Sequence, residues 1–140
     1  MAANSQSAGH LSIKPDMKNW LFIAGVNGAL AVLAGAFAAH ALGSRLDPRL
    51  LSAFSTAATY HLVHSLALGI AGLAARGAAR RRADIAAALF LAGIVLFCFS
   101  LYLLALTGIV AFAYATPVGG IAFVAGWIML AAAGLKMERP

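Results

Sequence analysis

Apolar residues dominate four long segments of this chain, and short polar segments separate them. The apolar segments are residues 20–42, 50–75, 83–107 and 116–135, and each has at least 20 residues. A helix of that length, rising about 1.5 Å per residue, crosses a hydrocarbon core of about 30 Å. The pattern predicts an all-α integral membrane protein with four transmembrane helices in a compact bundle.

The polar segments set the limits of this transmembrane domain, which we place at residues 20–136. Residues 1–19 form a polar leader that we expect to be flexible, and residues 137–140 form a short tail. The first apolar run is longer than the core of a secretory signal, and three further spans follow it. Cleavage of the leader is therefore not expected.

Turn-forming residues mark the predicted helix ends. Gly43 and Gly108 stand where the first and third helices stop. Asp47 followed by Pro48 is typical of a helix start, because aspartate caps free backbone N–H groups and proline fits the first helical position. Thr116 before Pro117 repeats this arrangement at the start of the fourth helix.

The composition agrees with a membrane protein and excludes other classes. Hydrophobic residues make up 63% of the chain and charged residues 10%, compared with roughly 25% charged residues in soluble domains. The formal charge is +6, but the basic residues stand between the apolar segments and not on a folded basic face, so we expect no nucleic-acid partner. Cys98 is the single cysteine, so no intramolecular disulfide can form.

The distribution of basic residues predicts how the chain is oriented. With four spans, Arg45 and Arg49 lie on one side of the membrane. The other eight lie on the opposite side: Lys14, Lys18, Arg76, Arg80, Arg81, Arg82, Lys136 and Arg139. Because cytoplasmic loops carry the excess of Lys and Arg, we expect both termini and the 76–82 loop in the cytoplasm. This loop is foremost a determinant of topology, and attraction of anionic lipid headgroups is the alternative.

Small residues recur along the predicted spans and indicate close helix packing. Lipid is as apolar as leucine, so membrane helices associate through the close contact that small side chains permit. The glycines for which we expect such packing are Gly25, Gly28, Gly35, Gly69, Gly72, Gly120 and Gly126. Dimerisation through one of these faces is an open alternative.

Polar side chains inside the spans are the candidates for function, because they are costly at membrane depth. The candidate cluster is His40, Tyr60, His61, His64, Ser100 and Tyr102. We expect neutral histidines that hydrogen-bond to neighbouring helices. Trp127 falls in the middle of the fourth span, where its indole N–H needs a partner such as Ser100, Tyr102 or a backbone carbonyl.

Haem and metal binding are disfavoured by the same positions. His61 and His64 are three residues apart on one predicted helix, so they cannot bind opposite faces of one haem. His40 is expected near the outer surface, and no mid-span carboxylate or second cysteine is available to complete a metal site. We therefore expect no metal and no cofactor.

Four ordered motifs resemble a family of small membrane proteins of unknown function, which includes bacterial YgdD and a human transmembrane relative. The motifs cover residues 35–42, Tyr60 with residues 64–67, residues 100–108, and residues 116–120 with Phe123, Gly126 and Trp127. Ala38 stands where that family more often has glycine. The resemblance implies a four-helix inner-membrane protein and carries no reaction or ligand with it.

The sequence contains no phosphate-binding glycine loop, metalloprotease motif or nucleophile elbow. We therefore expect a non-enzymatic accessory or structural protein, multi-pass in the bacterial inner (plasma) membrane, in contact with the lipid bilayer. The assemblies we expect for such a protein are a larger membrane complex, in which it is a subunit beside a membrane-protein partner, and a homo-oligomer. The alternative is a small transporter or lipid/quinone-binding module, with a cavity lined by the histidine, tyrosine and serine cluster.

Overall fold

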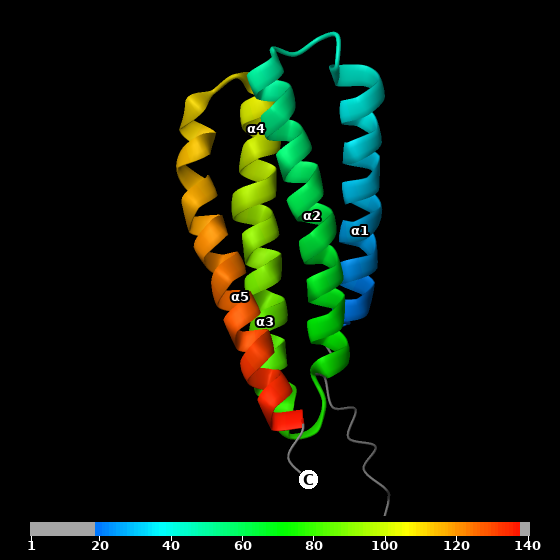
Figure 1. Ribbon diagram of the computed structural model, residues 1–140, viewed down its shortest axis with the longest axis vertical. Coiled ribbons are helices and arrows are strands. Elements are labelled where there is room, and N and C mark those ends of the chain that lie inside the picture. Colours follow the sequence, from blue (N-terminus) through cyan, green and yellow to red (C-terminus); the bar gives the residue numbers. More distant parts are fainter. Residues whose placement is uncertain (1–18, 138–140) are drawn as a thin grey trace, which may run out of the picture.

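Four helical rods lie side by side and form one bundle (Figure 1). The computed structural model describes residues 19–137, so residues 1–18 of the predicted leader and residues 138–140 of the predicted tail lie outside the described residues. Within residues 19–137, every regular element is helical. Four segments are long and apolar enough to cross a membrane. The predicted four-span helical fold is thereby confirmed.

Each span has the following bounds. The first joins α1 (Trp20–Phe37) to the π-helical turn η1 (Ala38–Leu42), and the second is α2 (Pro48–Ala74). The third consists of the 3₁₀ turn η2 (Gly77–Ala79), α3 (Arg80–Gly93), the π-helical turn η3 (Ile94–Phe99) and α4 (Ser100–Thr107). The fourth consists of the 3₁₀ helix η4 (Val110–Ala115) and α5 (Thr116–Met137). The last two spans start six residues before their predicted positions, because 3₁₀ turns precede α3 and α5 and α3 itself starts at Arg80.

The second span is the centre of the bundle. α2 contacts α1, α3, α4 and α5, whereas α1 packs chiefly against α2 and leaves much of its surface exposed (Figure 1). α3 and α5 form the other closely packed pair. Leu68, Phe90 and Ile94 are fully buried between these helices and form the centre of the core.

Local sequence explains the helix ends. The Asp47 carboxylate accepts a hydrogen bond from the backbone N–H of Arg49 at 2.8 Å, and Pro48 occupies the first turn of α2. Gly108 ends α4 in the left-handed conformation, with φ of 70°, and its N–H donates to the Leu104 carbonyl at 2.8 Å. Only glycine adopts this conformation without steric cost, which is why the helix stops there.

Three predicted packing glycines lie in close helix contacts. A Cβ added at Gly72 would lie 2.5 Å from the Trp20 Cβ, and one at Gly126 would lie 2.8 Å from the Phe90 ring. A Cβ at Gly69 would lie 3.3 Å from a side chain of α1. At these points the absence of a side chain sets the distance between helices.

The expectation of packing within the bundle does not hold at Gly25 and Gly35. A Cβ at either position meets nothing within 4 Å, so neither glycine is required for a close helix contact. Gly28 and Gly120 make only ordinary contacts, at 4.0 and 3.9 Å. A tighter contact occurs at Gly93, which the sequence did not single out and which lies against a phenylalanine ring of α5.

The π-helical turn η3 is a feature that the hydrophobic pattern did not predict. α5 approaches its backbone closely, since a Cβ on Gly119 would overlap the backbone nitrogen of Phe97. Ser100 donates to the Phe97 carbonyl at 2.9 Å and shares a 2.8 Å hydrogen bond with the Thr116 hydroxyl. Such turns occur mostly as local insertions in α-helices, and here the turn lies where α5 crosses the third span.

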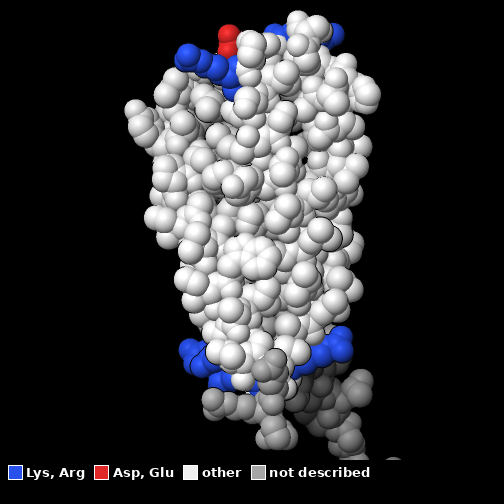
Figure 2. Space-filling view, in the orientation of Figure 1, with Lys and Arg blue, Asp and Glu red and all other residues white. Residues whose placement is uncertain are grey.

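The two ends of the bundle differ in charge. We call the end with Trp20, the loop between α2 and α3, and Met137 the basic end; the opposite end carries Arg45, Asp47 and Arg49. Figure 2 shows Lys and Arg gathered at both ends, with a broad uncharged band between them. Tyr114 is 79% exposed at the opposite end, whereas Trp20 at the basic end is 6% exposed.

Candidate functional site

A hydrogen-bonded chain crosses the middle of the bundle and joins three spans. His61 of α2 is 1% exposed. Its Nε2 lies 3.1 Å from Asn27 Oδ1 of α1, and its Nδ1 lies 3.2 Å from the Tyr102 hydroxyl of α4. The Asn27 amide nitrogen donates to the Ile23 carbonyl at 2.8 Å. The chain thus connects α1, α2 and α4 through one buried side chain, His61, and two half-buried ones.

These contacts define the proton positions on His61. Because the Asn27 nitrogen donates to Ile23, its oxygen is the atom turned toward His61 and can only accept. His61 therefore carries its proton on Nε2, and Nδ1 accepts from the Tyr102 hydroxyl. Every donor in this chain then has an acceptor, as buried polar groups require.

His64, one turn further along α2, takes part in a second network. Trp127 of α5 donates its indole N–H to His64 Nε2 at 3.2 Å, so this nitrogen must accept. His64 Nδ1 lies 2.8 Å from the Tyr60 carbonyl, to which it donates. The His64 ring also stacks on Phe123, with ring centroids 3.5 Å apart. His64 is therefore protonated on Nδ1, the opposite tautomer to His61.

The structure divides the predicted polar cluster into separate parts. His61 and Tyr102 are bonded to each other, and the Tyr60 ring stacks on His64 with a centroid distance of 5.7 Å. Ser100 bonds instead to the start of α5. His40 is exposed in η1 and has no described contact with the cluster, because it projects from the end of the first span.

The predicted partners of Trp127 were wrong. Neither Ser100, Tyr102 nor a backbone carbonyl accepts its N–H; the acceptor is His64. Sequence reasoning also missed Asn27, although a lone amide within an apolar span is itself a signal. Thr116 was read only as a helix start, and its bond to Ser100 depends on how α5 approaches η3.

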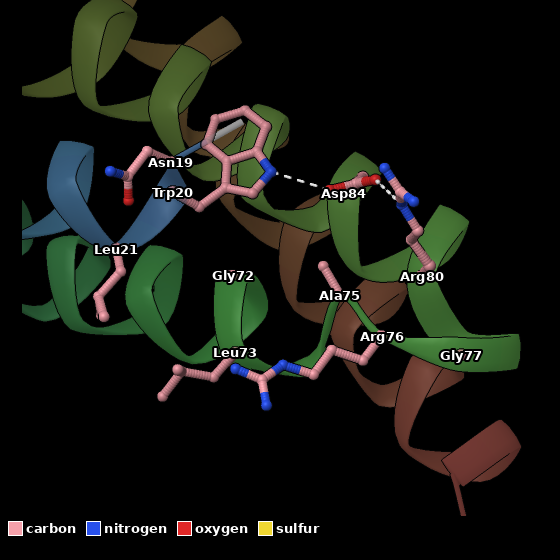
Figure 3. A pocket seen from close by; sticks show the side chains of 10 residues that line it. All are labelled: Asn19, Trp20, Leu21, Gly72, Leu73, Ala75, Arg76, Gly77, Arg80 and Asp84. Carbon is pink, nitrogen blue, oxygen red and sulfur yellow. Dashed lines mark hydrogen bonds and ion pairs between the residues drawn. The ribbon is translucent and has the colours of Figure 1, made fainter. Parts of the chain in front are cut away.

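A second polar group lies at the basic end. The Trp20 indole N–H donates to Asp84 Oδ1 at 2.9 Å, and Arg80 Nε lies 3.7 Å from Asp84 Oδ2 (Figure 3). Arg82 Nη1 donates to the Ala132 carbonyl of α5 at 2.8 Å. Trp20 is buried at this end by its bond to the carboxylate and by its contact with Gly72.

Two adjoining cavities of about 620 Å³ each open at this end. The first lies between the start of α1, the end of α2 and the following loop (Figure 3). The second lies beside the start of α3. Arg80, Asp84 and Gly77 line both. Neither cavity is lined by His61, His64 or Tyr102, so these two do not supply the cavity that the transporter alternative requires.

The chemistry available in the described residues is that of hydrogen bonding between helices. Within residues 19–137, no group of three His, Cys, Asp or Glu side chains is arranged to hold a metal ion. In the same range, every buried side-chain nitrogen and oxygen has a hydrogen-bond partner. His61 and His64 are engaged on both ring nitrogens, which leaves neither nitrogen of these two side chains available for a ligand.

These features define a multi-pass helical membrane protein whose buried polar side chains join its helices. The family model described as "Protein of unknown function (DUF423)" matches residues 34–120. The chain belongs to this family, which agrees with the expected membership of a small membrane family of unknown function.

Bacterial relatives agree in length and description. The UPF0382 membrane protein SAB0533 of Staphylococcus aureus is 40% identical over 120 residues, which cover 86% of this chain and 98% of the relative. The UPF0382 membrane protein YwdK of Bacillus subtilis is 39% identical over 121 residues, with the same coverage of both chains. No solved structure matches this chain.

Proposed function

We propose that this protein is a non-enzymatic accessory or structural component of the bacterial inner membrane. The observation that carries the proposal is the engagement of the intramembrane polar groups with one another. Both ring nitrogens of His61 and of His64 are hydrogen-bonded, and Ser100 is bonded to Thr116. A general base or a ligand site needs a group that can exchange its partner, whereas these groups hold helices together.

The inner-membrane location is part of the proposal. Proteins that span bacterial outer membranes are typically closed β-barrels, whereas this chain is a helical bundle. The bias of eight basic residues to two supports cytoplasmic termini. We also propose that bacterial YgdD and its human relative belong to the same family, since the four motifs of this chain resemble theirs.

We further propose that the protein is a subunit of a larger membrane complex and that its partner is a different membrane protein. The described chain has no folded part outside the bundle in which a soluble activity could reside. α1 supports the assembly, because it packs chiefly on α2 and exposes Gly25, Ala29 and Ala36 along one side. Such residues let a second helix approach closely.

Affinity purification from native membranes in a mild detergent tests this proposal. We expect a stoichiometric complex with one other membrane protein, identified by mass spectrometry. Recovery of the protein alone, or as a homo-oligomer, contradicts the subunit proposal and gives weight to a small-molecule or lipid role. A purified protein that turns over a substrate contradicts the non-enzymatic part.

A pair of glycine variants locates the contact. Gly25→Leu adds a side chain on the exposed side of α1, and Gly134→Leu adds the same side chain on α5; a Cβ meets nothing within 4 Å at either site. We expect both variants to keep the melting temperature of the wild type. Gly25→Leu should lose the partner and Gly134→Leu should keep it. Equal recovery with both variants excludes this side of α1 as the contact.

A further inference from the structure

The first cavity at the basic end has walls of two kinds. Polar groups from Asn19, Arg76, Arg80 and Asp84 line one part. Leu21 and Leu73, which are 56% and 52% exposed, line another, together with the body of the Trp20 ring. A cavity with cationic and apolar walls fits an amphiphile better than it fits a soluble metabolite.

The arginines at this end differ in whether their guanidinium groups have a hydrogen-bond or ion-pair partner among the described residues. Arg80 is paired with Asp84, and Arg82 donates to the Ala132 carbonyl. Within residues 19–137, no hydrogen bond or ion pair engages the Arg76 guanidinium, which Figure 3 shows turned toward Leu73. Because one carboxylate stands against two guanidinium groups, the lining has an excess positive charge.

The position of the cavity along the bundle matches the depth of lipid headgroups. It lies at the start of α1 and the end of α2, where the uncharged surface meets the basic residues (Figure 2). A lipid phosphate at this depth would meet Arg76, and its acyl chains would continue along Leu21 and Leu73 into the hydrocarbon core. Guanidinium groups bind phosphate oxygens through two parallel hydrogen bonds.

We propose that this cavity binds the headgroup phosphate of an anionic phospholipid from the surrounding membrane, with Arg76 as its principal ligand. Zwitterionic lipids carry the same phosphate together with an ammonium group, which the excess positive charge disfavours. Basic pockets between transmembrane helices are a known kind of site for anionic headgroups. The proposal goes beyond an accessory role, since it concerns a lipid and not a protein partner.

This role of Arg76 is separable from its effect on topology. Removing one positive charge leaves seven basic residues on the predicted cytoplasmic side against two on the other, so we expect the orientation to be retained. Arg76→Gln therefore tests the lipid site. Lys136→Gln removes a charge from the same end of the bundle without touching the cavity, and serves as the matched control.

Native mass spectrometry of the full chain tests the site, after purification and addition of equal amounts of phosphatidylglycerol and phosphatidylcholine. We expect the wild type and Lys136→Gln to retain phosphatidylglycerol in preference. Arg76→Gln should retain it about fivefold less, which corresponds to about 1 kcal/mol per basic residue. Ala75→Phe, which keeps every charge but adds a ring to the cavity wall, should lower retention as well.

Three outcomes overturn the proposal. Equal retention of the two lipids by the wild type removes the preference for an anionic headgroup. An equal loss of phosphatidylglycerol in Arg76→Gln and Lys136→Gln shows that general surface charge, and not the cavity, retains the lipid. Displacement of phosphatidylglycerol by millimolar inorganic phosphate, with equal stabilisation by phosphate alone, identifies free phosphate as the ligand. Melting temperatures of all variants are measured in parallel to show that each is folded. If Arg76→Gln does not fold, the retention of phosphatidylglycerol by Ala75→Phe tests the site, and unchanged retention in that variant overturns the proposal.

Discussion

Trp20 and Asp84, 64 positions apart in the chain, are joined by a hydrogen bond of 2.9 Å between the indole nitrogen and a carboxylate oxygen. The bond links the start of α1 to the start of α3 at the basic end (Figure 3). α1 otherwise packs chiefly on α2, so this contact ties the outermost helix to the other half of the bundle.

The Trp20–Asp84 bond should make a measurable contribution to stability. We expect Trp20→Phe and Asp84→Ala each to lower the free energy of unfolding by about 1–3 kcal/mol, because a hydrogen bond to a charged group is lost. The double variant should lose about 1 kcal/mol less than the sum of the two. Reversible unfolding in mixed detergent micelles measures the free energy of unfolding of the wild type, the two single variants and the double variant. If the losses of the two single variants add up to the loss of the double variant, the two residues are not coupled. Tyr114→Phe, at the exposed opposite end, is the control and should leave the free energy of unfolding unchanged.

Glycines at close contacts should differ from glycines on the open side of α1. Gly126→Ala places a methyl group 2.8 Å from the fully buried Phe90 ring, so we expect a loss of about 1–3 kcal/mol. Gly35→Ala meets nothing within 4 Å and should be neutral or stabilising by up to about 1 kcal/mol. Reversible unfolding in mixed detergent micelles compares the free energies of unfolding of Gly126→Ala and Gly35→Ala. Equal losses are incompatible with the helix contacts described above.

The two buried histidines should be observed as opposite neutral tautomers. ¹⁵N NMR of ring-labelled protein should show a protonated Nε2 on His61 and a protonated Nδ1 on His64, because their partners require these positions. In Asn27→Leu, the His61 signals should change and those of His64 should stay, which makes His64 an internal control. Identical tautomers on both rings rule out at least one of the two networks.

The topology follows from the charge bias and can be tested with reporter fusions. Fusions after residue 140 and in the loop before Arg80 should both report a cytoplasmic location. A fusion in the loop between α1 and α2, near Arg45, should report the periplasmic side. A periplasmic C-terminus contradicts the predicted orientation. Opposite locations for the C-terminus and the Arg80 loop contradict the four-span topology.

Features that depend on neighbouring residues were predictable. The Asp47–Pro48 helix start and the helix stop at Gly108 need only local backbone chemistry, and the structure has both. The candidate site was only partly predictable. Tyr102 and His61 were both named, but the partner that joins them to α1, Asn27, was missed, and Trp127 was given the wrong acceptors.

The reason lies in helix rotation, which hydrophobicity does not specify inside a membrane. Because lipid and leucine are equally apolar, a span such as residues 83–107 has no strong polar face to indicate which side turns inward. The π-helical turn η3 adds a local change of rotation before Ser100. The directions of polar side chains therefore depend on contacts between helices that are distant in sequence.

The sequence by itself determined that the chain spans a membrane four times, where three of its turns lie and which end is basic, since these follow from length, local chemistry and charge count. The tertiary structure alone decided that His61 turns to α1 and α4 while His64 turns to α5, that Trp20 is buried against Asp84, and that Gly25 and Gly35 lie outside the close helix contacts. These depend on how closely the helices approach and on their rotation, which many weak contacts set together.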